Sequence, residues 1–130
     1  MKILFLGDVV GVAGCSKLTK NLLSEIRSKN IDFVIVNGEN AASQGVGLTK
    51  EICKDFFNCG VDVITTGNHV WDQKEIMDYI EKEERLLRPK NLIEPAPGRG
   101  FNIYTTNKNL RIGVLNLMGN VFMKKCEDVF

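Results

Sequence analysis

The chain has 130 residues, a length typical of one domain that can bury roughly two thirds of its unfolded surface. Its composition, 44% hydrophobic and 25% charged, excludes a disordered or fibrous protein. With 17 basic and 16 acidic residues the formal net charge is +1, which removes the electrostatic basis for an extended nucleic-acid surface.

The cysteine pattern and the apolar runs indicate a cellular compartment. The cysteines form no C-x-x-C pair, and a single histidine cannot complete a zinc cluster with them. They are Cys15, Cys53, Cys59 and Cys126, and such scattered cysteines are typical of reduced thiols. The apolar start of the chain is too short for a signal peptide, and no run approaches the roughly 18 apolar residues that span a bilayer. We therefore expect a cytoplasmic protein with no membrane partner.

Apolar runs alternate with amphipathic stretches through the first two thirds of the chain. Continuous β-branched runs predict strands buried on both faces, and apolar residues at helical spacing predict helices. Gly11 and Gly14 are expected in a loop before the first helix, and Thr49 and Gly60 are expected to cap and to stop the second. In chain order we predict a strand over 2–6, a helix over 16–29, a strand over 33–36, a helix after Thr49, a strand over 61–65 and a helix over 73–82.

This β-α-β-α-β order predicts an α/β fold in which right-handed crossovers join parallel strands. If the strands are added in one direction, all the helices cover one face of the sheet, and the equally apolar opposite face needs another layer. From residue 86 prolines and glycines predict an irregular connection. Two further runs, 101–105 and 110–117, predict a hairpin that supplies part of the missing layer.

Polar residues follow each of the three predicted parallel strands. Asp8 follows the first, Glu39 and Asn40 follow the second, and Asn68 and His69 follow the third. Because parallel strands bring their carboxyl ends to one edge, these residues are expected to share a crevice. Carboxylates, amides and an imidazole suit divalent cations such as iron, manganese or magnesium. A bridging Glu39 could hold two metals for in-line phosphoryl displacement.

Each of these residues also has an ordinary structural explanation. Asp8 could be a loop or cap residue, and Glu39 with Asn40 could form a turn. Asn68 could hold a left-handed turn beside a structural His69. Polar residues nevertheless follow all three strands at the same edge of the predicted sheet, and this agreement favours a common site.

Other motifs fit less well. The glycines at 7, 11 and 14 lack dinucleotide-loop spacing, and Asp8 would place negative charge where a pyrophosphate binds. Trp71 is interpreted as a packing residue, and Asn116 and Asn120 as loop residues. A flavodoxin-like or Rossmann-type module that binds nucleotide without metal is a further alternative.

Five segments in order resemble a known family. They are Gly-Asp-Val-Val-Gly at 7–11, Asn-Gly-Glu-Asn-Ala-Ala at 37–42, Gly-Asn-His-Val-Trp-Asp at 67–72, Arg-Pro at 88–89 and Asn-Leu-Met-Gly at 116–119. Together they resemble the YmdB-type metallophosphoesterases of the calcineurin-like superfamily, over essentially the whole chain. Family members are about twice as long. The resemblance therefore implies an α/β/β/α sandwich of which residues 1–130 supply about the first half, as a single partial domain.

The resemblance also implies roles for the polar cluster. Asp8 and Asn40 would bind one metal ion, Asn68 would bind the other, Glu39 would bridge both, and His69 would be the proton donor. The implied cofactors are two divalent or mixed-valence ions, iron or manganese first, with magnesium or zinc as alternatives. The implied substrate is a small phosphodiester, notably a 2′,3′-cyclic nucleotide.

The chain departs from the family pattern in two arginines and in length. Cys15 and Asn120 stand where the family usually has arginine. The second half of family members supplies three histidine ligands and the rest of the second sheet, so this chain would hold half of the site and could be inactive alone. The alternative is a non-catalytic remnant or interaction module. Its uncovered sheet face would bind a second copy or a partner in place of a C-terminal half.

Overall fold

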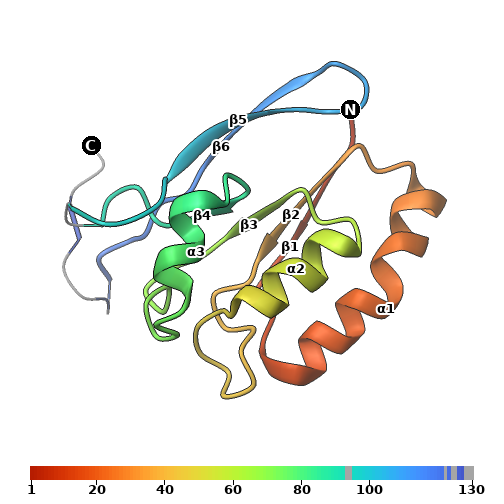
Figure 1. Ribbon diagram of the computed structural model, residues 1–130. Coiled ribbons are helices and arrows are strands. Elements are labelled where there is room, and N and C mark those ends of the chain that lie inside the picture. Colours follow the sequence, from red (N-terminus) through yellow and green to blue (C-terminus); the bar gives the residue numbers. More distant parts are fainter. Residues whose placement is uncertain (93–94, 122, 124–125, 128–130) are drawn as a thin grey trace.

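The computed structural model describes residues 1–92, 95–121, 123 and 126–127. Helices and strands alternate in the first part of the chain, and a hairpin follows (Figure 1). The elements are β1 (Ile3–Leu6), α1 (Gly11–Lys29), β2 (Phe33–Asn37), α2 (Lys50–Asn58), β3 (Val63–Thr65), α3 (Ile76–Lys82), β4 (Leu86–Leu87), β5 (Phe101–Thr105) and β6 (Arg111–Leu115).

The first four strands form one parallel sheet in the order β1-β2-β3-β4. Leu4 pairs with Val34, and Asn37 pairs with Thr65. Because the strand order follows the chain order, each new strand is added on the same side of the preceding one. β5 and β6 form a separate antiparallel pair. The predicted α/β fold, its parallel sheet and its hairpin are therefore confirmed.

The helices lie on one face of the sheet, as the right-handed crossovers require, and the hairpin lies on the other (Figure 1). On the helical side Val34, Val36 and Ile64 are fully buried with Phe56 of α2 and Ile80 of α3. The residues that alternate with them form a second core with the hairpin, made of Phe33, Val63, Leu87, Ile112 and Val114. The layers are thus helix, sheet and sheet, the first three layers of the expected sandwich.

The prediction that the first strand is buried on both faces is wrong. Leu4 and Leu6 pack into the helical core, but Ile3 is 46% exposed and Phe5 is 61% exposed. The reason is that β1 is an edge strand and the hairpin covers its neighbours instead. A groove of about 560 Å³ runs along this face, lined among others by Ile3, Phe5, Ile35, Val114 and Leu115.

Several predicted boundaries also need correction. α1 begins at Gly11, five residues early, because Gly11 takes a positive φ of 57° that turns the chain into the helix. Gly14 lies inside this helix against Val9. The helix predicted from residue 73 begins at Ile76, and its Met77 is exposed rather than buried.

Two strand assignments change as well. The strand predicted over 61–65 forms only over Val63–Thr65. Leu86 and Leu87 form a fourth parallel strand where an irregular connection was predicted. A strand of two residues is too short for any periodicity to reveal it.

The predicted ends of the second helix are confirmed. The Thr49 hydroxyl accepts a hydrogen bond from the Ile52 N–H at 3.3 Å, which satisfies one of the free donors of the first turn. Gly60 follows the helix with a φ of 102°, a conformation that favours glycine.

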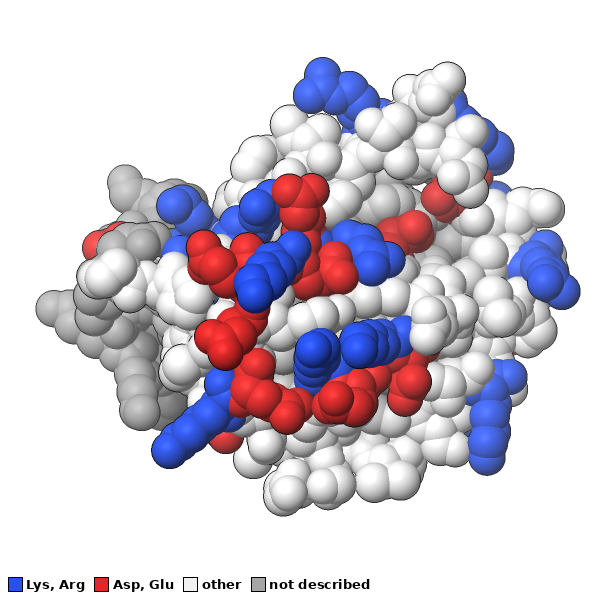
Figure 2. Space-filling model, viewed as in Figure 1, with Lys and Arg blue, Asp and Glu red and all other residues white. Residues whose placement is uncertain are grey.

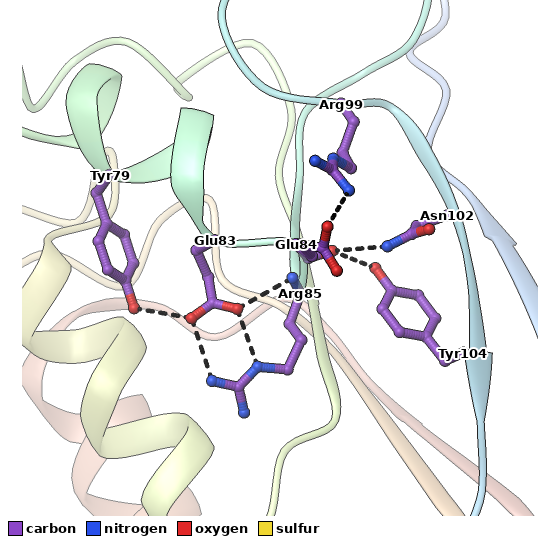
Figure 3. A network of polar contacts seen from close by, with 7 residues as sticks. All are labelled: Tyr79, Glu83, Glu84, Arg85, Arg99, Asn102 and Tyr104. Atoms are coloured by element: carbon purple, nitrogen blue, oxygen red, sulfur yellow. Dashed lines mark hydrogen bonds and ion pairs between the residues drawn. The ribbon is translucent and has the colours of Figure 1, made fainter.

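The turn between α3 and β4 anchors the hairpin (Figure 3). The backbone carbonyl of Glu84 accepts hydrogen bonds from the Tyr104 hydroxyl at 2.7 Å and from the Asn102 amide at 3.3 Å. Burial raises the pKa of Tyr104 to about 12, so its hydroxyl stays protonated and donates. The Glu84 carboxylate also pairs with Arg99 at 2.8 Å.

Surface charge, cysteine state and helix character add three observations. Basic and acidic side chains are interleaved over α2 and α3, with no field of a single sign on that face (Figure 2). All four cysteines are free. Within the described ranges, no helix has both the length and the apolar character needed to cross a membrane.

A polar clamp ties the far end of the hairpin to the start of the main sheet. The Lys108 ammonium lies 2.5 Å from one oxygen of Asp32, and the Lys2 N–H donates to the other at 2.7 Å. The hydrogen bond from Lys108, helped by that from Lys2, holds the pKa of Asp32 below its usual range. Asp32 therefore stabilises the fold above the pKa of an unfolded aspartate, and that contribution is lost as pH falls through the folded pKa.

We predict that Asp32→Asn lowers the free energy of unfolding at pH 7, and that the difference from wild type narrows as pH falls below about 4. Urea denaturation at pH 7 and at acid pH measures both values. Asp78→Asn is the control, because Asp78 is exposed on α3. A deficit of the same size at every pH would contradict the clamp.

Candidate functional site

Backbone hydrogen bonds draw the loops beyond the sheet together at its carboxyl edge. The Val9 N–H donates to Asn37 O at 3.0 Å, and the Gly38 N–H donates to Thr65 O at 3.0 Å. These bonds continue the parallel pairing of β1 with β2 and of β2 with β3 past the ends of the strands. The residues after all three strands are therefore held side by side, as the sequence predicted.

Asp8 and Asn40 meet directly at this edge. The Asn40 amide nitrogen donates to Asp8 Oδ2 at 2.8 Å, and the Gly11 N–H donates to Asn40 O at 2.9 Å. The Asn40 side-chain oxygen is buried and has no hydrogen-bond partner among the residues that the structure describes. A buried amide oxygen without a hydrogen-bond donor costs free energy, and a bound cation would remove this cost by taking the oxygen as a ligand.

Glu39 lies against the backbone of Gly67, at the end of β3. A Cβ placed on Gly67 would come within 1.7 Å of Glu39 Oε2, so only glycine allows the carboxylate to occupy this position. The Glu39 N–H donates to Asn37 Oδ1 at 3.0 Å, which turns the chain sharply after the strand. The loops that follow β2 and β3 thus come into close contact, because Gly67 has no side chain to separate them.

The electrostatic environment of Glu39 opposes its charge. Burial, and then the neighbouring charge of Asp8, raise the pKa of Glu39, while the charge of His69 and a side-chain hydrogen bond with Asn37 act in the opposite direction. Two carboxylates near each other in a partly desolvated site are the arrangement that a bound cation relieves.

Asn68 and His69 follow Gly67 in the same loop, and both are half-buried. His69 Nδ1 lies 2.6 Å from Asp72 Oδ2, a contact that the sequence did not predict. The sequence did contain a signal for this contact, because His69 and Asp72 are three positions apart, a spacing at which a single turn of the backbone can bring two side chains together. Asn68 makes no side-chain hydrogen bond within the described part of the chain, so its amide oxygen is uncommitted.

Comparison with known proteins is informative at this point. The family described as YmdB-like protein matches residues 4–130. The chain belongs to this family. A curated relative from Bacillus subtilis (strain 168), named 2′,3′-cyclic-nucleotide 2′-phosphodiesterase, is 42% identical over 131 residues, which span 100% of this chain and 48% of the relative.

The fold of this YmdB-like chain also matches solved structures. A hypothetical protein from Thermus thermophilus matches with a TM-score of 0.89 and 36% identity, over 98% of this chain and 49% of that one. A structure described as a novel phosphatase, from Mycoplasma pneumoniae, matches with a TM-score of 0.83 and 35% identity, over 92% and 43%. The chain spans about half the length of these relatives.

Three residues of the family motifs have structural roles. Asn116, interpreted from the sequence as a loop residue, is buried and donates to Thr66 O at 2.8 Å and to Leu87 O at 3.1 Å. It thereby joins the end of the hairpin to the site edge of the main sheet. Arg88 is 3% exposed and donates to the carbonyls of Pro89 and Pro97, which orders the connection to β5. Trp71 packs against the helical core, as predicted.

The site supplies few charged ligands of its own. Across residues 1–92, 95–121, 123 and 126–127, no group of three or more His, Cys, Asp or Glu side chains is placed to hold a metal ion. The cluster at the sheet edge relies on two amides, Asn40 and Asn68, beside its carboxylates.

We predict that Asn116→Ala lowers the free energy of unfolding by roughly 1–3 kcal/mol, because Thr66 O loses its donor in a buried position. Urea denaturation at neutral pH measures the change. Asn107→Ala, in the exposed turn of the same hairpin, should change stability by less than about 0.5 kcal/mol. Equal effects of the two substitutions would contradict the proposed joint.

Proposed function

We propose that the chain is the metal-binding N-terminal half of a phosphodiesterase acting on 2′,3′-cyclic nucleotides. The observation that carries the proposal is the convergence of Asp8, Glu39 and Asn40 with the Asn68–His69 loop at one sheet edge. Family membership and the name of the Bacillus subtilis relative supply the substrate class. The coarser conclusion, a phosphoesterase family, agrees with the phosphatase named among the solved structures.

The residues present fit two cations at this edge. Asp8 and Asn40 would hold one ion, Asn68 would hold the other, and Glu39 would bridge them. The buried oxygen of Asn40, which has no partner within the described part of the chain, and the raised pKa of Glu39 both support a cation here. Oxygen-rich ligation favours iron or manganese, with magnesium or zinc as alternatives. When bound, such ions neutralise charge on a phosphoryl group and activate water.

The remaining ligands would come from a C-terminal half. The relatives are about twice as long as this chain, and the groove beside Ile3 and Phe5 is an apolar face that such a half would cover. In this proposal residues 1–130 form a single, partial domain. The second half would complete both the metal site and the second sheet.

The chemistry proposed for His69 is proton delivery. Hydrolysis adds one water: its oxygen bonds to phosphorus, and the bond between phosphorus and the ribose 2′-oxygen breaks. His69 gives a proton to that 2′-oxygen, and the proton released by the attacking water restores the ring. The product is a 3′-phosphomonoester with a free 2′-hydroxyl.

An interaction module is the second candidate function. It is favoured by the same exposed apolar face, where Ile3, Phe5 and Leu115 are each more than 45% exposed. In that case the polar cluster is inherited but idle, and the face binds a second copy. Sedimentation would then show a dimer, whether or not metal is present.

We predict that Mn²⁺ raises the thermal midpoint of the chain and that Gly67→Ala abolishes the rise. A Cβ at this position displaces the Glu39 carboxylate, which lies at the end of a flexible side chain, so the fold itself persists. Saturation at 100 times the dissociation constant corresponds to about 2.7 kcal/mol. Scanning fluorimetry with Mn²⁺ and with chelator measures the shift.

Gly119→Ala is the matched control for this substitution, because a Cβ there would meet nothing within 4 Å. It should respond to Mn²⁺ like wild type. A wild-type response from Gly67→Ala, or no response of wild type to Mn²⁺, Fe²⁺, Mg²⁺ or Zn²⁺, would contradict the metal site.

We further predict that the whole protein, in which a C-terminal half completes this chain, converts 2′,3′-cyclic AMP to 3′-AMP in a metal-dependent reaction, and that His69→Ala lowers the rate to less than about one hundredth of the wild-type rate. Chromatographic separation of the nucleotides measures the product. Equal rates in the two proteins, or no turnover with any of the four metals, would remove the catalytic assignment from this chain.

A further inference from the structure

Asp72 is a titratable residue beside the site to which neither the sequence nor the proposed metal centre assigns a role. Its Oδ2 lies 2.6 Å from His69 Nδ1. At so short a nitrogen–oxygen distance, a hydrogen bond must join the two atoms. An ionised carboxylate can only accept such a bond. The hydrogen bond is therefore donated by the His69 Nδ1–H.

The turn that carries the two side chains is anchored in the core. The Val70 N–H donates to Gly67 O at 3.2 Å, and the Asp72 N–H donates to His69 O at 3.1 Å, so two successive turns follow β3. Val70 is 1% exposed, and Trp71 packs against the core cluster to which Val70 belongs. With these two residues directed inward, the side chains of His69 and Asp72 are held next to each other on the outer side.

Asp72 is also fixed from the opposite direction by the loop that follows β2. A Cβ on Gly47 would lie 3.2 Å from the Cβ of Asp72 and 2.8 Å from Cγ of Gln73, so the two backbones are in close contact here. The Gln73 amide donates to Val46 O at 3.1 Å. Contacts from two loops therefore hold the backbone at Asp72, while its side chain is 41% exposed beside His69.

We propose that Asp72 is a positioning residue for His69: it accepts the Nδ1–H, fixes the ring tautomer and orientation, and leaves Nε2 as the atom that delivers a proton. The catalytic part of this inference rests on the proposed function. The structural part concerns only the ring and its carboxylate.

The structural part can be read by NMR, because His69 is the only histidine in the chain. In a chain labelled with ¹⁵N-histidine, two-bond ¹H–¹⁵N correlations at alkaline pH distinguish the two neutral tautomers. Free imidazole prefers the Nε2–H form, whereas the proposal expects the Nδ1–H form in the wild-type chain. Asp72→Ala should return the ring to the Nε2–H form.

Two further variants sharpen this measurement. Asp78→Ala removes an exposed carboxylate on α3 and should keep the wild-type tautomer. Gly47→Ala places a Cβ against Asp72 and Gln73 without changing the pair itself, and should weaken the Nδ1–H form. A wild-type ring in the Nε2–H form, or an unchanged ring in Asp72→Ala, overturns the proposal.

The catalytic part of the proposal is tested by comparing two substrates whose leaving groups differ in their need for a proton. For 2′,3′-cyclic AMP, whose ribose oxygen needs a proton to leave, Asp72→Ala should lower kcat about 10–100-fold with little change in KM. For bis(p-nitrophenyl) phosphate, whose aryl oxide leaves unprotonated, the loss should be much smaller. Equal losses for both substrates would overturn the role in proton delivery. Absence of turnover in wild type would count against the proposed function, and the NMR result would then decide the role of Asp72.

Discussion

The geometry of the candidate site depends on the absence of a side chain at Gly67. Asn37 and Thr65 are paired in register, so the segments that follow β2 and β3 leave the sheet side by side. A side chain on Gly67 would occupy the space of the Glu39 carboxylate. Without one, Glu39 reaches across the end of β3 and comes within electrostatic reach of Asp8 and His69. The close approach of the two backbones thus brings together residues as distant in the sequence as Asp8 and His69.

This approach has an electrostatic cost. Burial and the charge of Asp8 both oppose the ionised form of Glu39, and no described residue donates a hydrogen bond to the buried Asn40 side-chain oxygen. A fold under selection for stability alone would have little reason to keep such a cluster. A cation bound between these groups would reverse the sign of each unfavourable contribution. The same local features that weaken the metal-free fold are those that support the proposed metal centre.

The two faces of the main sheet are completed differently. Helices cover one face along its length, whereas the hairpin covers β2, β3 and β4 and leaves Ile3 and Phe5 of β1 exposed. The hairpin is held at one end by Asp32 and Lys108, and at the other by Asn116, which also reaches the site edge. Completion of the second sheet and completion of the metal site are therefore linked in the proposed whole protein, because both lie where a C-terminal half would join this chain.

The sequence by itself determined the order of elements, the parallel sheet, the hairpin and the convergence of the polar residues. The reason is that hydrophobic periodicity and right-handed crossovers leave few arrangements for a β-α-β-α-β chain. The five ordered motifs at 7–11, 37–42, 67–72, 88–89 and 116–119 together indicated the family. Tertiary structure alone decided which face of β1 is exposed, since that depends on where the hairpin lies. It also decided the hydrogen bonds by which Asn116 joins the hairpin to the main sheet and the strand at Leu86–Leu87, because each arises from contacts that no local pattern encodes. The three-residue spacing of His69 and Asp72 allowed their contact, but only the folded turn after β3 showed that it forms.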